Sequence, residues 1–146
     1  MRALGIDYGE RRIGLALSDP TALLASPWKT IANDANVRAA AQRLAIEINA
    51  LTAEDDGLSV VVIGLPRRLS GEANDQTAHV RALAWLLGKT VSVPIDLQDE
   101  RLTSHAADEI LAGRERDWRK RKQNLDAMAA ALILQDYLDS RRRITS

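Results

Sequence analysis

Small or polar residues and large apolar residues alternate along two short stretches near the start of the chain, residues 2–8 and 12–18. A period of two is typical of β-strands, and Gly9 between the two stretches suits the turn of a hairpin. A third strand is predicted near residues 26–32, after Asp19 and Pro20 end the second. The first part of the chain is therefore predicted to be an antiparallel meander.

The rest of the chain alternates between helical and strand patterns. Apolar residues at helical spacing predict a helix between residues 37 and 51, and the continuous apolar run 58–64 predicts a central parallel strand. A loop leads to a second helix with Val80, Leu83 and Leu87 on its buried side, and a strand over 91–100 is placed near an edge by Pro94. A short helix is expected from Thr103 or Ser104 to Gly113, and a last helix over about 124–140, whose alanines 129–131 allow close packing on a sheet.

This order of elements predicts one α/β domain over residues 1–146. Three antiparallel strands followed by parallel βα units give a mixed five-stranded sheet with helices on both faces. The length of 146 residues is sufficient for one continuous core.

Composition and charge narrow the function classes. The 20 basic and 20 acidic side chains balance, which argues against a generic binder of polyanions, but residues 113–146 hold nine Lys or Arg against five Asp or Glu. Cysteine is absent, which excludes disulfides and thiolate metal sites. There is no N-terminal apolar segment and no run of 18 apolar residues, so we expect a cytoplasmic protein without membrane association.

Three acidic residues stand out by their places in the predicted elements. Asp7 lies within the first strand, beyond Ala3 and Gly5, where a carboxylate is costly unless it is paired or bound to a metal. The alternative for Asp7 is to cap a turn or to pair with Arg11 or Arg12. Further candidates are Glu100 and Asp126.

Glu100 follows the last predicted strand, where active-site groups of α/β folds often collect, although it could simply be a solvated strand end. Asp126 is placed in the first turn of the last predicted helix, where an acidic residue could merely complement the helix dipole.

Taken together, the three carboxylates predict a metal site. Three carboxylates that meet without a cation repel one another, whereas Mg²⁺ or Mn²⁺ turns them into a hard-oxygen site for phosphoryl chemistry. Two such ions about 4 Å apart could activate water and stabilise the leaving oxygen of a phosphodiester.

Four stretches of the chain resemble the YqgF/RuvX family, whose members look like ribonuclease H-fold nucleases and Holliday junction resolvases. They read "GIDYGERRIGLALSD", "VVIGLPRRLSGE", "DERLTS" and "LDAMAAALILQDYL", and they run nearly from end to end. The resemblance implies a ribonuclease H-like fold, Asp7, Glu100 and Asp126 as metal-binding catalytic carboxylates, and processing of the 5′ end of precursor 16S ribosomal RNA.

One departure from the related resolvases concerns a fourth carboxylate. Bacterial resolvases that resemble this pattern carry a second Asp one helical turn after the helix Asp, and the chain has Ala129 there. The set is incomplete unless Asp99 or Asp96 substitutes, which favours RNA hydrolysis over junction resolution.

Basic residues are predicted to hold the nucleic acid. The run "RERDWRKRK" over 114–122 precedes Asp126 and would attract a phosphate backbone, and Trp118 within it could stack on an unpaired base or pack onto the domain. The loop after the central strand offers another phosphate clamp but lacks the ending of a nucleotide P-loop. Arg12 and Arg101 could orient the carboxylates, contact substrate or form ordinary ion pairs. The expected substrate-binding residues are Arg12, Arg67, Arg68, Arg101, Thr103, Arg119, Lys120, Arg121 and Lys122.

Four functions compete at this stage. The first is a metal-dependent endonuclease acting on structured RNA, and the second is a dimeric Holliday junction resolvase acting on four-way DNA. The third is a non-catalytic RNA-binding or transcription factor that uses only the basic surface. The last is an actin-like kinase or ATPase relative, because "GIDYG" resembles a phosphate loop of that superfamily, but one domain of this length is half of what such proteins need.

Overall fold

The computed structural model describes residues 1–33, 36–66, 75–99 and 118–145, and for residues 75, 118–124 and 142–145 it describes the main chain only. The strands are β1 (Arg2–Tyr8), β2 (Arg12–Ser18), β3 (Ala25–Ala32), β4 (Leu58–Leu65) and β5 (Ile95–Asp99). The helices are α1 (Val37–Ala53), α2 (Asp75–Thr90) and α4 (Trp118–Thr145).

The five strands form one mixed sheet in the order β3-β2-β1-β4-β5. β1 pairs antiparallel with β2, which pairs antiparallel with β3, while β1-β4 and β4-β5 are parallel. The predicted meander and the central position of the strand predicted over 58–64 are confirmed. The strand predicted over 91–100 lies at the edge of the sheet as expected, but it is shorter and begins only after Pro94. The sheet order places β1, which carries Asp7, in the middle of the molecule.

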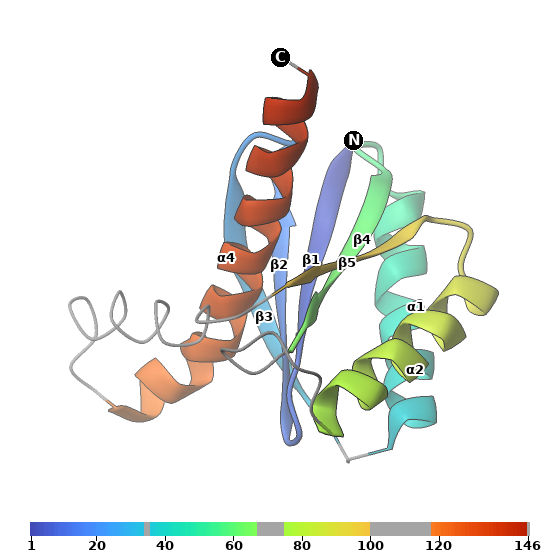
Figure 1. The fold of residues 1–146 in the computed structure, drawn as a ribbon, viewed down its shortest axis with the longest axis vertical. Coiled ribbons are helices and arrows are strands. Elements are labelled where there is room, and N and C mark those ends of the chain that lie inside the picture. Colours follow the sequence, from blue (N-terminus) through green and yellow to red (C-terminus); the bar gives the residue numbers. More distant parts are fainter. Residues whose placement is uncertain (34–35, 67–74, 100–117, 146) are drawn as a thin grey trace.

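Helices cover both faces of the sheet, with α1 and α2 on one side and α4 on the other (Figure 1). The face with α1 and α2 holds the larger core, built from big aliphatic side chains such as Leu4, Ile6, Leu44 and Ile63. The face with α4 holds a smaller core of Ala3, Ala16, Val62 and the α4 residues Ala130, Ile133 and Leu134, among others. The alternation along β1 and β2 therefore sorts large side chains to one layer and small ones to the other.

Small residues on the sheet let α4 approach closely. A Cβ atom on Gly5 would lie 2.8 Å from Cβ of Leu134 and 2.9 Å from the carbonyl oxygen of Ala130. Contacts under 3 Å are not tolerated, so glycine at this position is what allows the helix its place. The three consecutive alanines 129–131 are buried at this contact, as predicted.

The last helix is longer than the sequence pattern predicts. We expected about residues 124–140, and α4 runs from Trp118 to Thr145. The apolar stripe that defines the buried part is confined to the predicted range, whereas the additional turns at both ends are rich in Arg and Lys, which favour helices without adding an apolar pattern. None of the helices in the described ranges is long and apolar enough to cross a membrane.

Candidate active site

Gly14 on β2 is the point where the helix that carries Asp126 meets the sheet, next to the strand that carries Asp7. Asp7 and Gly14 are directly opposite each other in the β1-β2 ladder, so they share one face of the sheet. A Cβ atom on Gly14 would lie 1.9 Å from the carbonyl oxygen of Asp126. The main chain of Asp126 therefore occupies the space above Gly14, beside Asp7.

The ladder geometry limits how far apart the two aspartates lie. Cβ positions directly opposite in an antiparallel pair are about 5 Å apart, so the Asp126 carbonyl oxygen, 1.9 Å from the Cβ position of Gly14, lies within about 7 Å of Cβ of Asp7. This separation is compatible with both carboxylates contacting one shared ion or a pair of ions. Residues 119 positions apart in the chain are thus neighbours at the end of β1.

Arg12 contributes a cation to the same face. It lies two residues before Gly14 on β2, and strand alternation therefore places it on the side of α4. Its Nε donates to Oδ2 of Asp126 at 2.8 Å, and the two side chains are 38% and 20% exposed. Of the alternatives left open for Arg12, the structure shows an ion pair, and its partner is Asp126.

The position of Asp126 within α4 removes the simplest alternative explanation for it. α4 begins at Trp118, eight residues earlier, and its first turn contains no acidic residue. Stabilisation by the helix dipole falls off within the first turn, so complementing the dipole does not account for Asp126. That alternative was wrong because the helix starts earlier than its apolar pattern.

The donor set at this point fits a divalent cation. Asp7 and Asp126 bring carboxylate oxygens, the hard ligands that Mg²⁺ and Mn²⁺ take, to one face of the sheet around Gly14. Within the ranges that the structure describes, no group of three or more potential metal ligands is found. Glu100 belongs to none of those ranges, so the three-carboxylate site is not tested by this search.

Several residues predicted for the site lie outside the described residues. β5 ends at Asp99, directly before Glu100. For the basic run, the structure gives the main chain from Trp118 onward as part of α4, but not the side chains. The predictions that remain untested concern Glu100, Arg67, Arg68, Arg101, Thr103, Arg119, Lys120, Arg121 and Lys122.

Asp96 is held at the other end of α4. Its Oδ2 accepts hydrogen bonds from the hydroxyl of Tyr137 and, at 2.9 Å, from Nη2 of Arg141. Tyr137 is eleven residues beyond Asp126 on the same helix, which is about 16 Å along its axis. Asp96 is therefore not the missing fourth carboxylate beside Asp126. Asp99, three residues further along β5, faces the opposite side of the sheet from Asp96.

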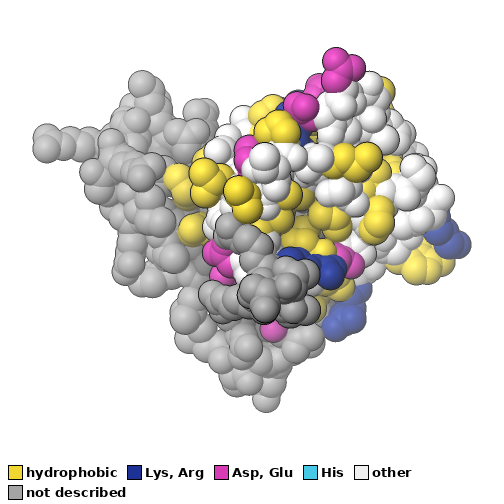
Figure 2. All heavy atoms as spheres, turned by 90° about the horizontal axis from the view of Figure 1, so that it is seen from above, with side chains coloured by type: hydrophobic (Ala, Val, Ile, Leu, Met, Phe, Trp, Pro, Cys, Tyr) yellow, Lys and Arg dark blue, Asp and Glu magenta, His cyan; other side chains and the backbone are white. Residues whose placement is uncertain are grey.

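Sequence reasoning missed the role of Gly14. A glycine inside a strand often marks the close approach of another main chain, so the signal was present. The partner of that glycine could not be read from the pattern, because Asp126 is distant in sequence. The described surface also shows no extended basic patch on the face drawn in Figure 2, where acidic, basic and apolar side chains are interspersed.

Comparison with known proteins gives relatives that span almost the whole chain. A protein from Chloroflexus aggregans is 43% identical over 139 residues, which cover 95% of this chain and 94% of that protein. A protein from Chloroflexus aurantiacus is 42% identical, and the match covers 95% of this chain and 87% of that protein. A protein from Nocardioides is 43% identical, and the match covers 95% of this chain and 88% of that protein. Each of these three is named "Putative pre-16S rRNA nuclease".

Solved structures support the fold. The chain is similar to RuvC of T. thermophilus in complex with a Holliday junction substrate, with a TM-score of 0.55, 16% identity, and coverage of 97% of this chain and 96% of that one. It is similar to the Fowlpox virus resolvase in complex with Holliday junction DNA, with a TM-score of 0.55, 11% identity, and coverage of 97% and 99%. The predicted ribonuclease H-like architecture is thereby confirmed.

The family model described as "RuvX: Holliday junction resolvase" matches residues 1–140. With curated relatives above 40% identity over nearly all of the chain, the match is decisive. The chain belongs to the RuvX family of nucleases, which hydrolyse phosphodiester bonds.

Proposed function

We propose that the chain is a divalent-metal-dependent endonuclease that hydrolyses phosphodiester bonds in structured RNA, with Asp7, Glu100 and Asp126 as its catalytic carboxylates. The observation that carries the proposal is the close approach of Asp126 to Asp7 over Gly14. The main chain of Asp126 lies against a strand position that only glycine can occupy, directly opposite Asp7, and this proximity supports a shared site.

Asp7 and Asp126 would hold Mg²⁺ or Mn²⁺, and Glu100, the residue after β5, would complete the set. A bound ion of this kind lowers the pKa of water and neutralises charge on the phosphate. Within this site Arg12 keeps the Asp126 carboxylate in one orientation through the bond from Nε. Hydrolysis forms a bond from a water oxygen to phosphorus and breaks the bond from phosphorus to the leaving ribose oxygen, which takes up a proton.

Precursor 16S ribosomal RNA is the substrate we favour. The name shared by the relatives supports this choice. So does the buried Ala129, which stands where junction resolvases resembling this pattern have an acidic residue. A ribosomal RNA precursor as the substrate would place the protein in the cytoplasm. Residues that follow β4, follow β5 or lie at the start of α4 would contact its backbone together with Arg12, namely Arg67, Arg68, Arg101, Thr103, Arg119, Lys120, Arg121 and Lys122.

Cleavage of a precursor 16S 5′-end fragment by the purified chain tests the proposal. We expect Mg²⁺-dependent product that excess EDTA removes, and loss of at least about a hundredfold in rate for Asp7→Asn, Glu100→Gln and Asp126→Asn. Asp136→Asn is the matched control, because Asp136 lies on α4 as well but is exposed. Undiminished cleavage by Asp7→Asn, or full activity in EDTA, would defeat the proposal, and metal-independent RNA binding without product would favour a non-catalytic factor.

Junction resolution is the second candidate, because the matching family model describes a Holliday junction resolvase. This function would require a homodimer that presents two sites to two strands of the junction. Incubation with a four-way DNA junction separates the two candidates. Symmetrical nicks in the junction, faster than cleavage of the RNA and accompanied by a dimer in sedimentation, would replace RNA with branched DNA as the substrate.

A further inference from the structure

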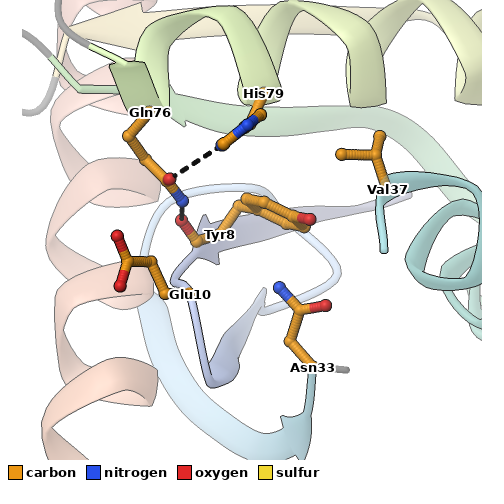
Figure 3. Close-up of a pocket in the computed structure, with 6 residues that line it drawn as sticks. All are labelled: Tyr8, Glu10, Asn33, Val37, Gln76 and His79. Carbon is orange, nitrogen blue, oxygen red and sulfur yellow. Dashed lines mark hydrogen bonds between the residues drawn. The ribbon is translucent and has the colours of Figure 1, made fainter. Parts of the chain in front are cut away.

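A cavity of about 200 Å³ opens on the face of the sheet opposite to Asp126, at the carboxyl end of β1. Asp7 and Tyr8 are consecutive on β1 and so face opposite sides of the sheet, which makes this cavity the neighbour of the proposed cleavage site. Figure 3 shows side chains from the β1-β2 hairpin, the end of β3, α1 and α2 converging around it. The lining residues are Tyr8, Glu10, Asn33, Val37, Gln76 and His79.

Asn33 brings an unsatisfied acceptor to this cavity. The residue is only 8% exposed, and its Nδ2 donates to the carbonyl oxygen of Gly9 at 2.7 Å. Since the carbonyl oxygen of Gly9 can only accept a hydrogen bond, the side-chain atom of Asn33 that faces it must be the nitrogen Nδ2. The other side, Oδ1, is buried and has no hydrogen-bond partner among the described residues. A buried amide oxygen without a donor is uncommon in folded proteins, so a donor that reaches Oδ1, from a bound molecule or from water, would be stabilised there.

The hydrogen bonds of Gln76 and His79 leave further acceptors. Gln76 Nε2 donates to the carbonyl oxygen of Tyr8 at 3.0 Å, so Gln76 Oε1 is the atom that faces His79 Nδ1 at 3.2 Å (Figure 3). His79 must therefore donate from Nδ1, and in its neutral form Nε2 is an acceptor. The carboxylate of Glu10 at the rim also only accepts. The cavity is thus matched to a ligand that carries several N–H donors.

We propose that this cavity binds one unpaired nucleobase of the RNA strand, with guanine preferred, an inference that rests on the proposed function. Guanine presents N1–H and the N2 amino group side by side, whereas adenine and cytosine present one amino group beside an acceptor and uracil one N–H between two carbonyls. Tyr8 and Val37 supply the apolar surface that a flat ring needs.

The size of the cavity suits a single base. A cavity of about 150 Å³ is sufficient for one benzene molecule, while pockets for drug-sized ligands begin at about 300 Å³. At about 200 Å³ the cavity lies between these limits. A guanine held here would fix the register of the strand relative to Asp7 and Asp126, and so would select which phosphodiester bond is cut.

Binding of short labelled RNA strands to the full-length chain tests this inference. The strands contain uridines with one central guanosine, inosine, adenosine or uridine, and fluorescence anisotropy is measured in EDTA so that nothing is cleaved. Inosine differs from guanosine only by the missing N2 amino group. We expect the guanosine strand to bind about three- to tenfold more tightly than the inosine strand, as the loss of one hydrogen bond predicts.

Variants locate the preference in the cavity. Asn33→Leu and His79→Ala should reduce the affinity for the guanosine strand to that for the uridine strand, and Asn49→Leu on the exposed side of α1 should leave it unchanged. Asn33→Leu also removes the hydrogen bond to Gly9 and could unfold the chain. The test therefore does not depend on this variant alone, because His79→Ala changes an exposed residue and the inosine strand is measured with the unchanged protein. Equal affinity for all four strands would overturn the inference.

Two further outcomes separate this inference from the proposed function. Metal-dependent cleavage of RNA without any guanine preference would overturn the base pocket and leave the nuclease proposal intact. Guanine preference without cleavage would overturn the nuclease proposal and leave the base pocket intact. Guanosine monophosphate is the remaining probe. If it binds by itself as tightly as the guanosine strand, the pocket serves a free nucleotide and the assignment to an RNA base is wrong.

Discussion

At the scale of single residues, the carboxylate of Asp126 depends on Arg12 for its orientation. The Nε–Oδ2 distance of 2.8 Å joins a strand residue to a helix residue in a contact that is only partly exposed. A half-exposed ion pair adds at most about 1 kcal/mol to the free energy of unfolding. Under the proposed function, we expect its main effect to be on the orientation of a catalytic carboxylate rather than on stability.

Arg12→Gln should therefore reduce catalysis far more than stability. Loss of the partner of a metal-binding carboxylate typically costs about 10- to 100-fold in activity, and we expect a decrease of this size in kcat with a change in unfolding free energy below about 1 kcal/mol. Arg11→Gln removes the same charge from an exposed neighbouring position and is the matched control. Steady-state cleavage and urea unfolding measure both effects. Equal losses in the two variants would mean that Arg12 contributes only charge.

Individual residues also show what the sequence could and could not predict. Strand alternation alone places Asp7 on the same face of the sheet as Ala3 and Gly5, but the small residues of that face accommodate α4 rather than leaving the face open. The partner of Arg12 did not follow, since two residues separated by 114 positions leave no local pattern. The unsatisfied Oδ1 of Asn33 was equally invisible, because it depends on how the residue after β3 packs against the β1-β2 hairpin.

At the scale of elements, the contact between α4 and the sheet depends on the glycine beneath Asp126. Gly14→Ala would place a Cβ 1.9 Å from the carbonyl oxygen of Asp126, so the helix or the strand must move. Overpacking of this kind costs about 1–3 kcal/mol, and the displaced Asp126 should lower the cleavage rate as well.

Gly88→Ala is the control for this prediction, because the added Cβ would meet nothing within 4 Å in α2. Replacing an exposed helical glycine should raise the unfolding free energy by up to about 1 kcal/mol and leave cleavage unchanged. Urea unfolding curves of both variants decide the matter. An unfolding free energy equal to that of the wild type in Gly14→Ala would show that α4 does not pack against the sheet as closely as described.

The turn between β2 and β3 is organised by one carboxylate. Oδ1 of Asp19 accepts from the main-chain N–H groups of Leu23 at 2.8 Å and Leu24 at 2.9 Å, and Oδ2 accepts from the hydroxyl of Thr21. The hydrogen bond from Leu24, followed by that from Thr21, lowers the pKa of Asp19 from 3.8 to about 2. Since the pKa is depressed on folding, the contribution of Asp19 to stability is present above 3.8 and is lost as the pH falls toward about 2.

This shift can be checked by following the side-chain carboxyl carbon of Asp19 by NMR during acid titration. We expect a midpoint near 2, and a turn that keeps its chemical shifts at pH 3. In Asp19→Asn the turn should not respond to pH in this range, because the amide does not titrate. A midpoint close to 4 would mean that the N–H groups of Leu23 and Leu24 are not directed at this carboxylate.

At the scale of the whole molecule, the layers follow from two periodicities that the sequence displays. Period two along residues 2–18 and helical spacing in the later segments predict a mixed sheet between helices, and the strand order confirms it. The start of α4 was not predictable, since a helix of Arg, Lys and Gln on its outer turns has no apolar stripe. The convergence of Asp7 with Asp126 came from resemblance and chain order rather than from any spacing.

If Asp7 and Asp126 hold a metal ion together, binding of that ion should raise the unfolding free energy of the whole chain. An ion that binds only the folded state stabilises it, and Mg²⁺ at ten times its dissociation constant adds about 1.4 kcal/mol. For a protein of this size the melting temperature should rise by about 3–6 °C, measured by differential scanning fluorimetry against buffer with EDTA. Asp7→Asn should remove most of the rise.

Asp96→Asn distinguishes the site from acidic residues in general. It should lower the melting temperature, because Tyr137 and Arg141 lose the negative charge that their hydrogen bonds share, yet it should keep the full rise with Mg²⁺. Loss of the rise in this variant would make Asp96 the fourth carboxylate, although its partner Tyr137 lies about 16 Å further along α4 than Asp126. A full rise in Asp7→Asn would instead show that the ion is held elsewhere, and the pair around Gly14 would need another explanation.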